Sequence, residues 1–83
     1  MASSVAYKAS VAGDLKRLDK PTARRVVEKL ERVLSANPHA GIPLTGEFLG
    51  LCKYRIGEYC VLYAKTPDGV LVLRVRHRKD AYR

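Results

Sequence analysis

The sequence predicts a small α+β fold of the order β-α-α-β-β-β, in which a two-helix hairpin packs on one face of an antiparallel sheet. Apolar residues recur at helical spacing over residues 10–36 and at strand spacing over residues 51–76. With 83 residues, the chain has room for one hydrophobic core. We therefore expect a single compact domain over residues 1–83, with the other face of the sheet left open.

The first part of the chain predicts a short strand and then a helix. Val5 and Tyr7 alternate with other residues within residues 4–9, which suits an opening strand. Over residues 10–19 the spacing becomes helical, and Ser10 can cap the start. The apolar stripe of this helix comprises Val11, Leu15 and Leu18, and the residues expected to face outward are Asp14, Lys16, Arg17 and Asp19.

A second helix is predicted over residues 21–36. It begins at Pro21, because proline is tolerated in the first helical turn, where its missing N–H has no partner anyway. Asn37-Pro38 ends it, since a residue before proline is pushed out of the helical region. Its apolar stripe comprises Ala23, Val26, Val27, Leu30, Val33 and Leu34.

The remaining residues predict a loop and three antiparallel strands. Residues 39–50 have no sustained period and form the loop. Residues 51–55 and 58–64 flank Ile56-Gly57 and predict a tight hairpin. A turn signal at residues 66–69 precedes the last strand at residues 70–76, and residues 77–83 form a short basic tail.

The charge of the chain favours a polyanionic partner. Sixteen Lys and Arg residues stand against eight Asp and Glu residues, so the net charge is +8. Phosphate polymers are the commonest partners of so basic a surface, which makes nucleic acid the leading partner class. A polyanionic protein, or a solvated surface that serves only solubility, fits the same charge.

Several kinds of site are not expected. Cys52 and Cys60 have no CxxC or Cys/His ligand spacing, so we expect no metal and interpret both as reduced thiols of a cytoplasmic protein. No window approaches the roughly 20 apolar residues of a membrane span, so no membrane partner is expected. The sequence holds no Gly-rich phosphate loop, nucleophilic triad or paired-carboxylate site, and no cofactor is expected.

The hairpin predicts which side chains share a face of the sheet. If Ile56 and Gly57 form the loop, Arg55 pairs with Glu58, and Lys53 pairs with Cys60. The open face then carries Leu51, Lys53, Arg55, Glu58, Cys60 and Leu62, and the face under the helices carries Tyr54, Tyr59, Val61 and Tyr63. On the last strand we expect Leu71, Leu73 and Val75 to point inward, and Val70, Val72, Arg74, Arg76 and Arg78 to point outward.

A basic patch on the open face is the strongest candidate site. Its four cations, which can bind phosphate together because Arg presents a planar fork of donors, are Lys53, Arg55, Arg74 and Arg76. A row of solvated strand residues is the alternative. His77 lies near this patch and could act as a general acid or base. The alternative is that His77 is a surface residue without a catalytic role. Tyr82 can stack on a base or pack on the sheet.

Several segments together resemble the RelE/ParE toxin superfamily. They are the strand leading into residues 12–18 (AGDLKRL), the Asn37-Pro38 break with Gly41 and Leu44 after it, residues 53–59 (KYRIGEY) followed by residues 61–63 (VLY), and the ending at residues 77–83 (HRKDAYR). The hairpin pattern K-x-R-x-G-[DE]-Y and the ending H-R-x-x-x-Y are specific in combination. The superfamily fold, two helices against an antiparallel sheet, agrees with the fold predicted from the residues.

The resemblance implies a toxin of a type II toxin–antitoxin system that binds in the ribosomal A site and cleaves mRNA by attack of a 2′-hydroxyl on the adjacent phosphate. It assigns catalytic roles to Lys53, Arg55, Arg76, Arg78 and Tyr82. RNA contacts are expected from Arg74, His77, Lys79 and Arg83. An acidic, RelB-like antitoxin is the implied protein partner, in a toxin–antitoxin hetero-oligomer.

Two positions depart from the family pattern. Cys60 stands where family members usually carry a catalytic Arg, and Leu51 stands where some carry a basic residue. The nuclease is therefore expected to be weakened or inactivated. The alternatives are a ParE-like toxin that poisons DNA gyrase without cutting RNA, and a non-toxic module that binds RNA or the ribosome.

Overall fold

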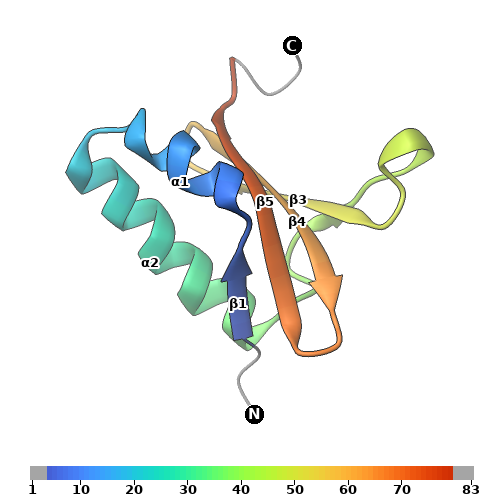
Figure 1. The fold of residues 1–83 in the computed structure, drawn as a ribbon. Helices are drawn as coiled ribbons and strands as arrows, with labels where there is room; N and C mark the ends of the chain where they lie inside the picture. The colour runs from blue at the N-terminus through green and yellow to red at the C-terminus, as the bar shows by residue number, and fades with distance from the viewer. Residues whose placement is uncertain (1–3, 80–83) are drawn as a thin grey trace.

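A computed structural model describes residues 4–79 as two helices lying against one face of a five-stranded sheet (Figure 1). In chain order, the elements are β1 (Ser4–Tyr7), α1 (Ala9–Lys16), α2 (Lys20–Ala36), β2 (Ile42–Pro43), a 3-10 turn (Gly46–Phe48), β3 (Leu51–Ile56), β4 (Tyr59–Thr66) and β5 (Gly69–His77). The strand order is β1-β5-β4-β3-β2. The predicted fold class is confirmed, but β1 runs parallel to β5, so the sheet is mixed rather than antiparallel throughout.

Helix α2 supplies much of the core. Its buried residues Val26, Leu30 and Leu34 lie along one stripe, as the helical spacing predicted. Asp19 caps its start by accepting the Thr22 N–H at 3.2 Å, and so belongs to this helix rather than to the outer face of the first. The core is completed by Val11, Cys52, Ile56, Val61, Tyr63, Val70, Val72 and Val75.

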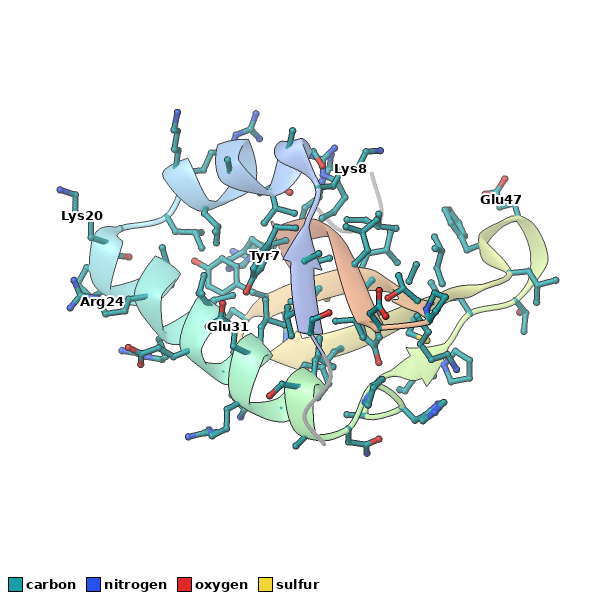
Figure 2. The ribbon with its side chains drawn as sticks, turned by 60° about the horizontal axis from the view of Figure 1, so that its bottom comes forward. Tyr7, Lys8, Lys20, Arg24, Glu31 and Glu47 are labelled. Atoms are coloured by element: carbon teal, nitrogen blue, oxygen red, sulfur yellow. The ribbon has the colours of Figure 1, made fainter. Side chains whose placement is uncertain are left out.

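Two tyrosine hydroxyls connect the elements. Tyr7 on β1 donates to Glu31 on α2 at 3.0 Å, and the two side chains point toward each other in Figure 2. Tyr63, fully buried on β4, donates to the Pro38 carbonyl at 2.8 Å and accepts the Gly41 N–H at 2.9 Å. A Cβ on Gly41 would lie within 2.8 Å of the Tyr63 ring, so this close approach needs glycine. The loop after α2 is thereby held against the sheet.

The β3–β4 hairpin has a different register from the predicted one. Its loop residues are Gly57 and Glu58, so Ile56 pairs with Tyr59, and Arg55 pairs with Cys60. A two-residue hairpin loop favours glycine at its first position, where φ is positive, and Gly57 has a φ of 56°. Arg55 therefore pairs with a residue two positions later in the chain than the predicted partner, Glu58. Because side chains alternate with a period of two, each strand residue keeps its predicted face.

The predicted alternation along β5 is wrong in the first half of that strand. Tyr63 pairs with Val72 while Leu62 pairs with Arg74, so Leu73 is an extra residue without a cross-strand partner. Because of this bulge, the side chains of residues 70–72 point to the opposite faces from those predicted. Val70, Val72 and Val75 are therefore all buried, whereas Leu71 and Leu73 are half-exposed.

Helix α1 closes the part of the β5 edge that β1 leaves open. Strand β1 pairs only as far as Val72, and beyond that point Ser10 donates its hydroxyl to the Leu73 carbonyl at 2.8 Å. Ser10 therefore binds the sheet instead of capping the helix. The Asp14 carboxylate accepts the Val75 N–H at 2.9 Å, so the prediction that Asp14 faces outward is wrong. Only 6% of Asp14 is exposed.

Arg74 compensates the buried charge of Asp14. Its Nε and Nη2 donate to the two carboxylate oxygens at 3.0 and 2.9 Å, a bidentate pair. Burial alone raises the pKa of the Asp14 carboxyl, but the hydrogen bonds from Arg74 and Val75 and the charges of Arg74 and Arg76 outweigh it. The pKa is therefore held below its ordinary value, and Asp14 stays ionised.

We predict that Asp14→Ala destabilises the fold by about 2 kcal/mol or more, because it leaves the Val75 N–H and the Arg74 guanidinium without their acceptor. Denaturant unfolding followed by circular dichroism measures this. Glu47→Ala is the matched control, since Glu47 lies exposed on the distant loop (Figure 2) and its loss should change stability by less than about 0.5 kcal/mol. Equal effects of the two substitutions would contradict the role given to Asp14.

Acid should unfold the protein partly through Asp14. Because its pKa is lowered in the folded state, Asp14 adds stability that is fully present above its unfolded pKa of about 4 and is lost as the pH falls through the folded pKa. We predict that Asp14→Asn makes the free energy of unfolding less dependent on pH below about pH 4. Asp68→Asn, at an exposed turn position, should keep the wild-type dependence.

Candidate functional site

The open face of the sheet carries two rows of side chains that run across the strands. Arg55, Cys60 and Arg76 are successive partners on β3, β4 and β5 and form the first row. Since neighbouring strands lie about 5 Å apart, the two arginine backbones are about 10 Å apart with the thiol between them. The structure thus brings these three predicted site residues together on one face, with Cys60 opposite Arg55 rather than Lys53.

The second row is less available to a ligand than predicted. It contains Lys53, Leu62 and Arg74 as successive partners. Lys53 lies half-buried at the centre of β3, on the same face as the first row. The guanidinium of Arg74 is occupied by Asp14, so Arg74 is a structural partner of helix α1 and does not join the predicted patch as a free cation.

A groove of about 250 Å³ lies where the end of α1 meets the end of β5. Its lining residues are Asp14, Arg17, Leu18, Tyr59, Val75, Arg76 and His77. Val75, Arg76 and His77 are consecutive strand residues whose side chains alternate, so the groove takes side chains from both faces of the sheet. Arg76 therefore belongs both to the open-face row and to this groove.

His77 lies on the helix-covered face rather than on the open one. It pairs with Tyr59 across the strands, and the two rings meet edge to face with centroids 5.4 Å apart. Its Nδ1 accepts the Lys79 N–H at 3.2 Å, so the neutral ring carries its proton on Nε2. His77 can reach a ligand in the groove, but it is not part of the row that contains Arg76.

The end of β5 is tied to the β3–β4 turn. Arg78 donates its backbone N–H to the Glu58 carbonyl at 2.7 Å, and its Nε lies 3.3 Å from the Glu58 carboxylate. Both side chains are more than half exposed, so this ion pair is weak and its guanidinium can turn toward a ligand. Lys79 is exposed beside it. Tyr82 and Arg83, also predicted to be site residues, lie outside the described residues.

Among residues 4–79, no three His, Cys, Asp or Glu side chains gather as the ligands of a metal ion would. In the same part of the chain, no helix has the length and apolar character needed to cross a membrane. The cationic side chains at the rows and the groove are those of arginine, lysine and histidine, which can donate hydrogen bonds to an anion.

Nearly the whole chain matches known toxins. Residues 5–82 match the family described as the ParE toxin of type II toxin–antitoxin systems. The chain is also 39% identical to Toxin RelE of Mycobacterium tuberculosis, over 95% of this chain and 84% of that protein. The chain belongs to the RelE/ParE toxin superfamily. The family predicted from the hairpin and the C-terminal pattern is thereby confirmed.

Solved structures of superfamily toxins have the same fold. The toxin–antitoxin complex RelBE2 of Mycobacterium tuberculosis contains a chain similar to this toxin with a TM-score of 0.86 at 32% identity, covering 96% of this chain and 95% of that one. The RelE–RelB complex of Pyrococcus horikoshii matches with a TM-score of 0.73 at 27% identity, covering 98% and 100%. The arrangement of helices and sheet described above is thus that of RelE toxins.

Sequence reasoning did not assign Asp14, Arg17 or Tyr59 to the site of this toxin. For Asp14 a signal was present, because Val11, Asp14, Leu15 and Leu18 follow the i, i+3, i+4, i+7 spacing of one helix face. A carboxylate on an apolar stripe calls for a buried cation or N–H group. The positions of Arg17 and Tyr59 beside the groove depend on how α1 docks on β5, which no local pattern records.

Proposed function

We propose that this toxin cleaves mRNA on the ribosome, in the A site, and that its reaction takes place on the open-face row of Arg55, Cys60 and Arg76. The observation that carries the proposal is the row itself, where two arginines whose backbones lie about 10 Å apart project from the same face of the described sheet. The identity of 39% to Toxin RelE supports it. A toxin that acts on ribosomes works in the cytoplasm.

The cations of the row and its neighbour Lys53 suit phosphoryl transfer. A 2′-hydroxyl of the mRNA attacks the adjacent phosphate, which forms a 2′,3′-cyclic phosphate and breaks the bond to the 5′ oxygen of the next nucleotide. The proton lost by the 2′-hydroxyl is matched by one gained at the leaving 5′ oxygen, which becomes a hydroxyl. Lys53 helps to activate the hydroxyl or to stabilise the transition state, Arg55 holds the phosphate, and Arg76 stabilises the leaving oxygen. Arginine is well suited to these roles, since fixed donors aimed at developing charge act most strongly in the transition state.

Residues around the row complete the proposed RNA site. Arg78 and Lys79 lie exposed at the end of β5, and His77 borders the groove. Tyr82 would stack on a base, and Arg83 would add a phosphate contact. Arg74 contributes through its charge and through the position that it gives to α1, since Asp14 holds its guanidinium.

An acidic antitoxin is the proposed protein partner. The similar toxins of Mycobacterium tuberculosis and Pyrococcus horikoshii were solved in complexes with their antitoxins. This chain exposes three large apolar side chains on the loop around β2, Ile42, Phe48 and Leu49, beside a basic sheet. Such a combination suits a partner segment that carries both apolar and acidic residues.

A second function, poisoning of DNA gyrase, is favoured by two observations. The family match is to ParE toxins, and by the resemblance described above Cys60 stands where family members usually carry an Arg. A thiol cannot supply the forked, charge-assisted hydrogen bonds of a guanidinium. Assays of ribosome-bound mRNA cleavage and of gyrase supercoiling, run on the same preparation, separate the two functions.

We predict that Arg76→Ala lowers the rate of ribosome-dependent mRNA cleavage by roughly 10²–10³-fold, because it removes one donor to the charge that develops in the transition state. Its melting temperature should stay close to that of the wild type, since the side chain of Arg76 makes no hydrogen bond or ion pair within residues 4–79. Arg32→Ala, an exposed arginine on α2, is the control and should retain activity. Cleavage unchanged in Arg76→Ala, or inhibition of gyrase by the wild type without mRNA cleavage, would refute the proposal.

Cys60→Arg should raise cleavage by about tenfold or more, because it adds a phosphate donor between Arg55 and Arg76. Three guanidiniums in one row repel each other, so the melting temperature should fall slightly without RNA and recover when RNA binds. Cys60→Lys is the control, since it adds the positive charge without the planar, forked donors of a guanidinium. Flat activity in Cys60→Arg with an intact fold would mean that the row is not the reactive site.

A further inference from the structure

A second cluster of cations lies away from the open-face row, where α1 ends and α2 begins. We call it the helix-turn patch; its members are Lys16, Arg17, Lys20 and Arg24. Lys16 is the last residue of α1, Arg17 is its C-cap, and Lys20 is the first residue of α2. All four side chains are exposed, and Figure 2 shows Lys20 and Arg24 projecting from the start of α2 away from the sheet.

No acid within residues 4–79 forms an ion pair with a member of this patch, although the exposed Asp19 is next to Lys20 and the exposed Glu28 lies one helical turn after Arg24. Asp14 is buried and paired with Arg74. Asp19 accepts hydrogen bonds from the Thr22 N–H and hydroxyl, and the cation whose charge acts on it is Arg25, which is not a patch member. Within residues 4–79, the ion pairs are those of Arg74 with Asp14 and Arg78 with Glu58, so none includes a patch residue.

Lys20 occupies a position that stability alone would give to an acid. The N-terminal end of a helix carries partial positive charge, so a cation there is unfavourable and a carboxylate is favourable. The first turn of α2 nevertheless has no acidic residue, and it begins with Lys20. Arg24 follows one turn later on the same side of the helix. These charges are better explained by a polyanionic partner than by the folding of the chain.

The patch is continuous with the groove. Arg17 lines the groove together with Arg76 and His77, and Lys16 and Lys20 lie on either side of Arg17 along the chain. A polyanion that occupies the groove therefore meets further cations as it passes the end of α1. The positive potential of the open face extends in this way onto the helical side of the molecule.

We propose that the helix-turn patch is a second nucleic-acid surface, which binds the phosphate backbone of folded RNA next to the RNA in the groove. The proposal rests on the proposed function and extends it to a docking contact without base recognition. A protein partner fits less well, because protein interfaces are built around buried apolar anchors. The large apolar side chains exposed within residues 4–79 are Tyr7, Ile42, Phe48 and Leu49, and none lies in the patch.

The test compares Lys20→Gln/Arg24→Gln with Arg32→Gln/Lys65→Gln in the full chain. Both variants remove one lysine and one arginine, all exposed, but the second pair lies outside the patch and the groove. The probe is an RNA duplex of about 16 base pairs, with binding measured over a series of salt concentrations. The patch variant should bind roughly tenfold more weakly at low salt, and the slope of log K against log[salt] should be shallower by about 1.5 to 2.

The control variant should lose much less affinity and keep a steeper slope. The patch variant should melt no lower than the wild type, since it removes Lys20 from the helix N-terminus. Equal losses in the two variants would overturn the proposal, as that result reflects net charge alone. It would also be overturned if polyglutamate competed with the duplex as well as unlabelled RNA does, which would identify an acidic protein as the partner.

Failure of the proposed function gives a different result. If the wild type does not cleave ribosome-bound mRNA while the patch variant still loses duplex binding, the patch binds RNA and the reaction assigned to the row is wrong. If the wild type cleaves mRNA and the patch variant binds the duplex like the wild type, the row is supported and the patch is rejected.

Discussion

The buried carboxylate of Asp14 determines how the free edge of β5 is closed. Strand β1 pairs with only the first part of β5, and an unpaired strand edge inside a domain leaves N–H and carbonyl groups without partners. Asp14 takes the Val75 N–H, and Ser10 supplies a donor to the Leu73 carbonyl. The buried negative charge of Asp14 is compensated by its ion pair with Arg74. This arrangement fixes where α1 lies on the sheet, and so determines the groove that contains Arg76.

The two faces of the sheet carry different kinds of side chain. One face is covered by the helices and carries the valines and tyrosines of the core; the other carries cations that would gain nothing from burial. Because side chains alternate along a strand, β3, β4 and β5 each place one set of residues in the core and the other set on the open face, where Arg55, Cys60 and Arg76 form the row. The bulge at Leu73 is needed for this, because it allows Val72 and Val75 to be buried while Arg74 and Arg76 stay on the open face.

The basic residues of this toxin serve at least two physical purposes. Arg74 neutralises a buried carboxylate, and Arg78 weakly joins the end of β5 to the β3–β4 turn. Arg55, Arg76 and the helix-turn patch instead leave positive potential facing solvent. A partner that is recognised through this potential releases counterions on binding, so salt affects both association and affinity strongly. The basic residues therefore divide between those that are paired within the fold and those that remain exposed to solvent.

Local pattern was sufficient for much of the fold and for placing Arg55, Cys60 and Arg76 on one face of the sheet. The spacing of Val26, Leu30 and Leu34 determined the buried stripe of α2, and the motif around Lys53 and Arg55 indicated the family. The predicted register of the β3–β4 hairpin differs from the observed one by two residues, because Gly57 takes the first loop position, where φ is positive. Each strand residue nevertheless lies on the face of the sheet that was predicted for it. Tertiary structure alone decided the rest. The bulge on β5, the burial of Asp14 and the occupation of Arg74 arise when α1 meets a strand edge about 60 residues away in the chain, and such long-range pairing leaves no periodic trace in sequence.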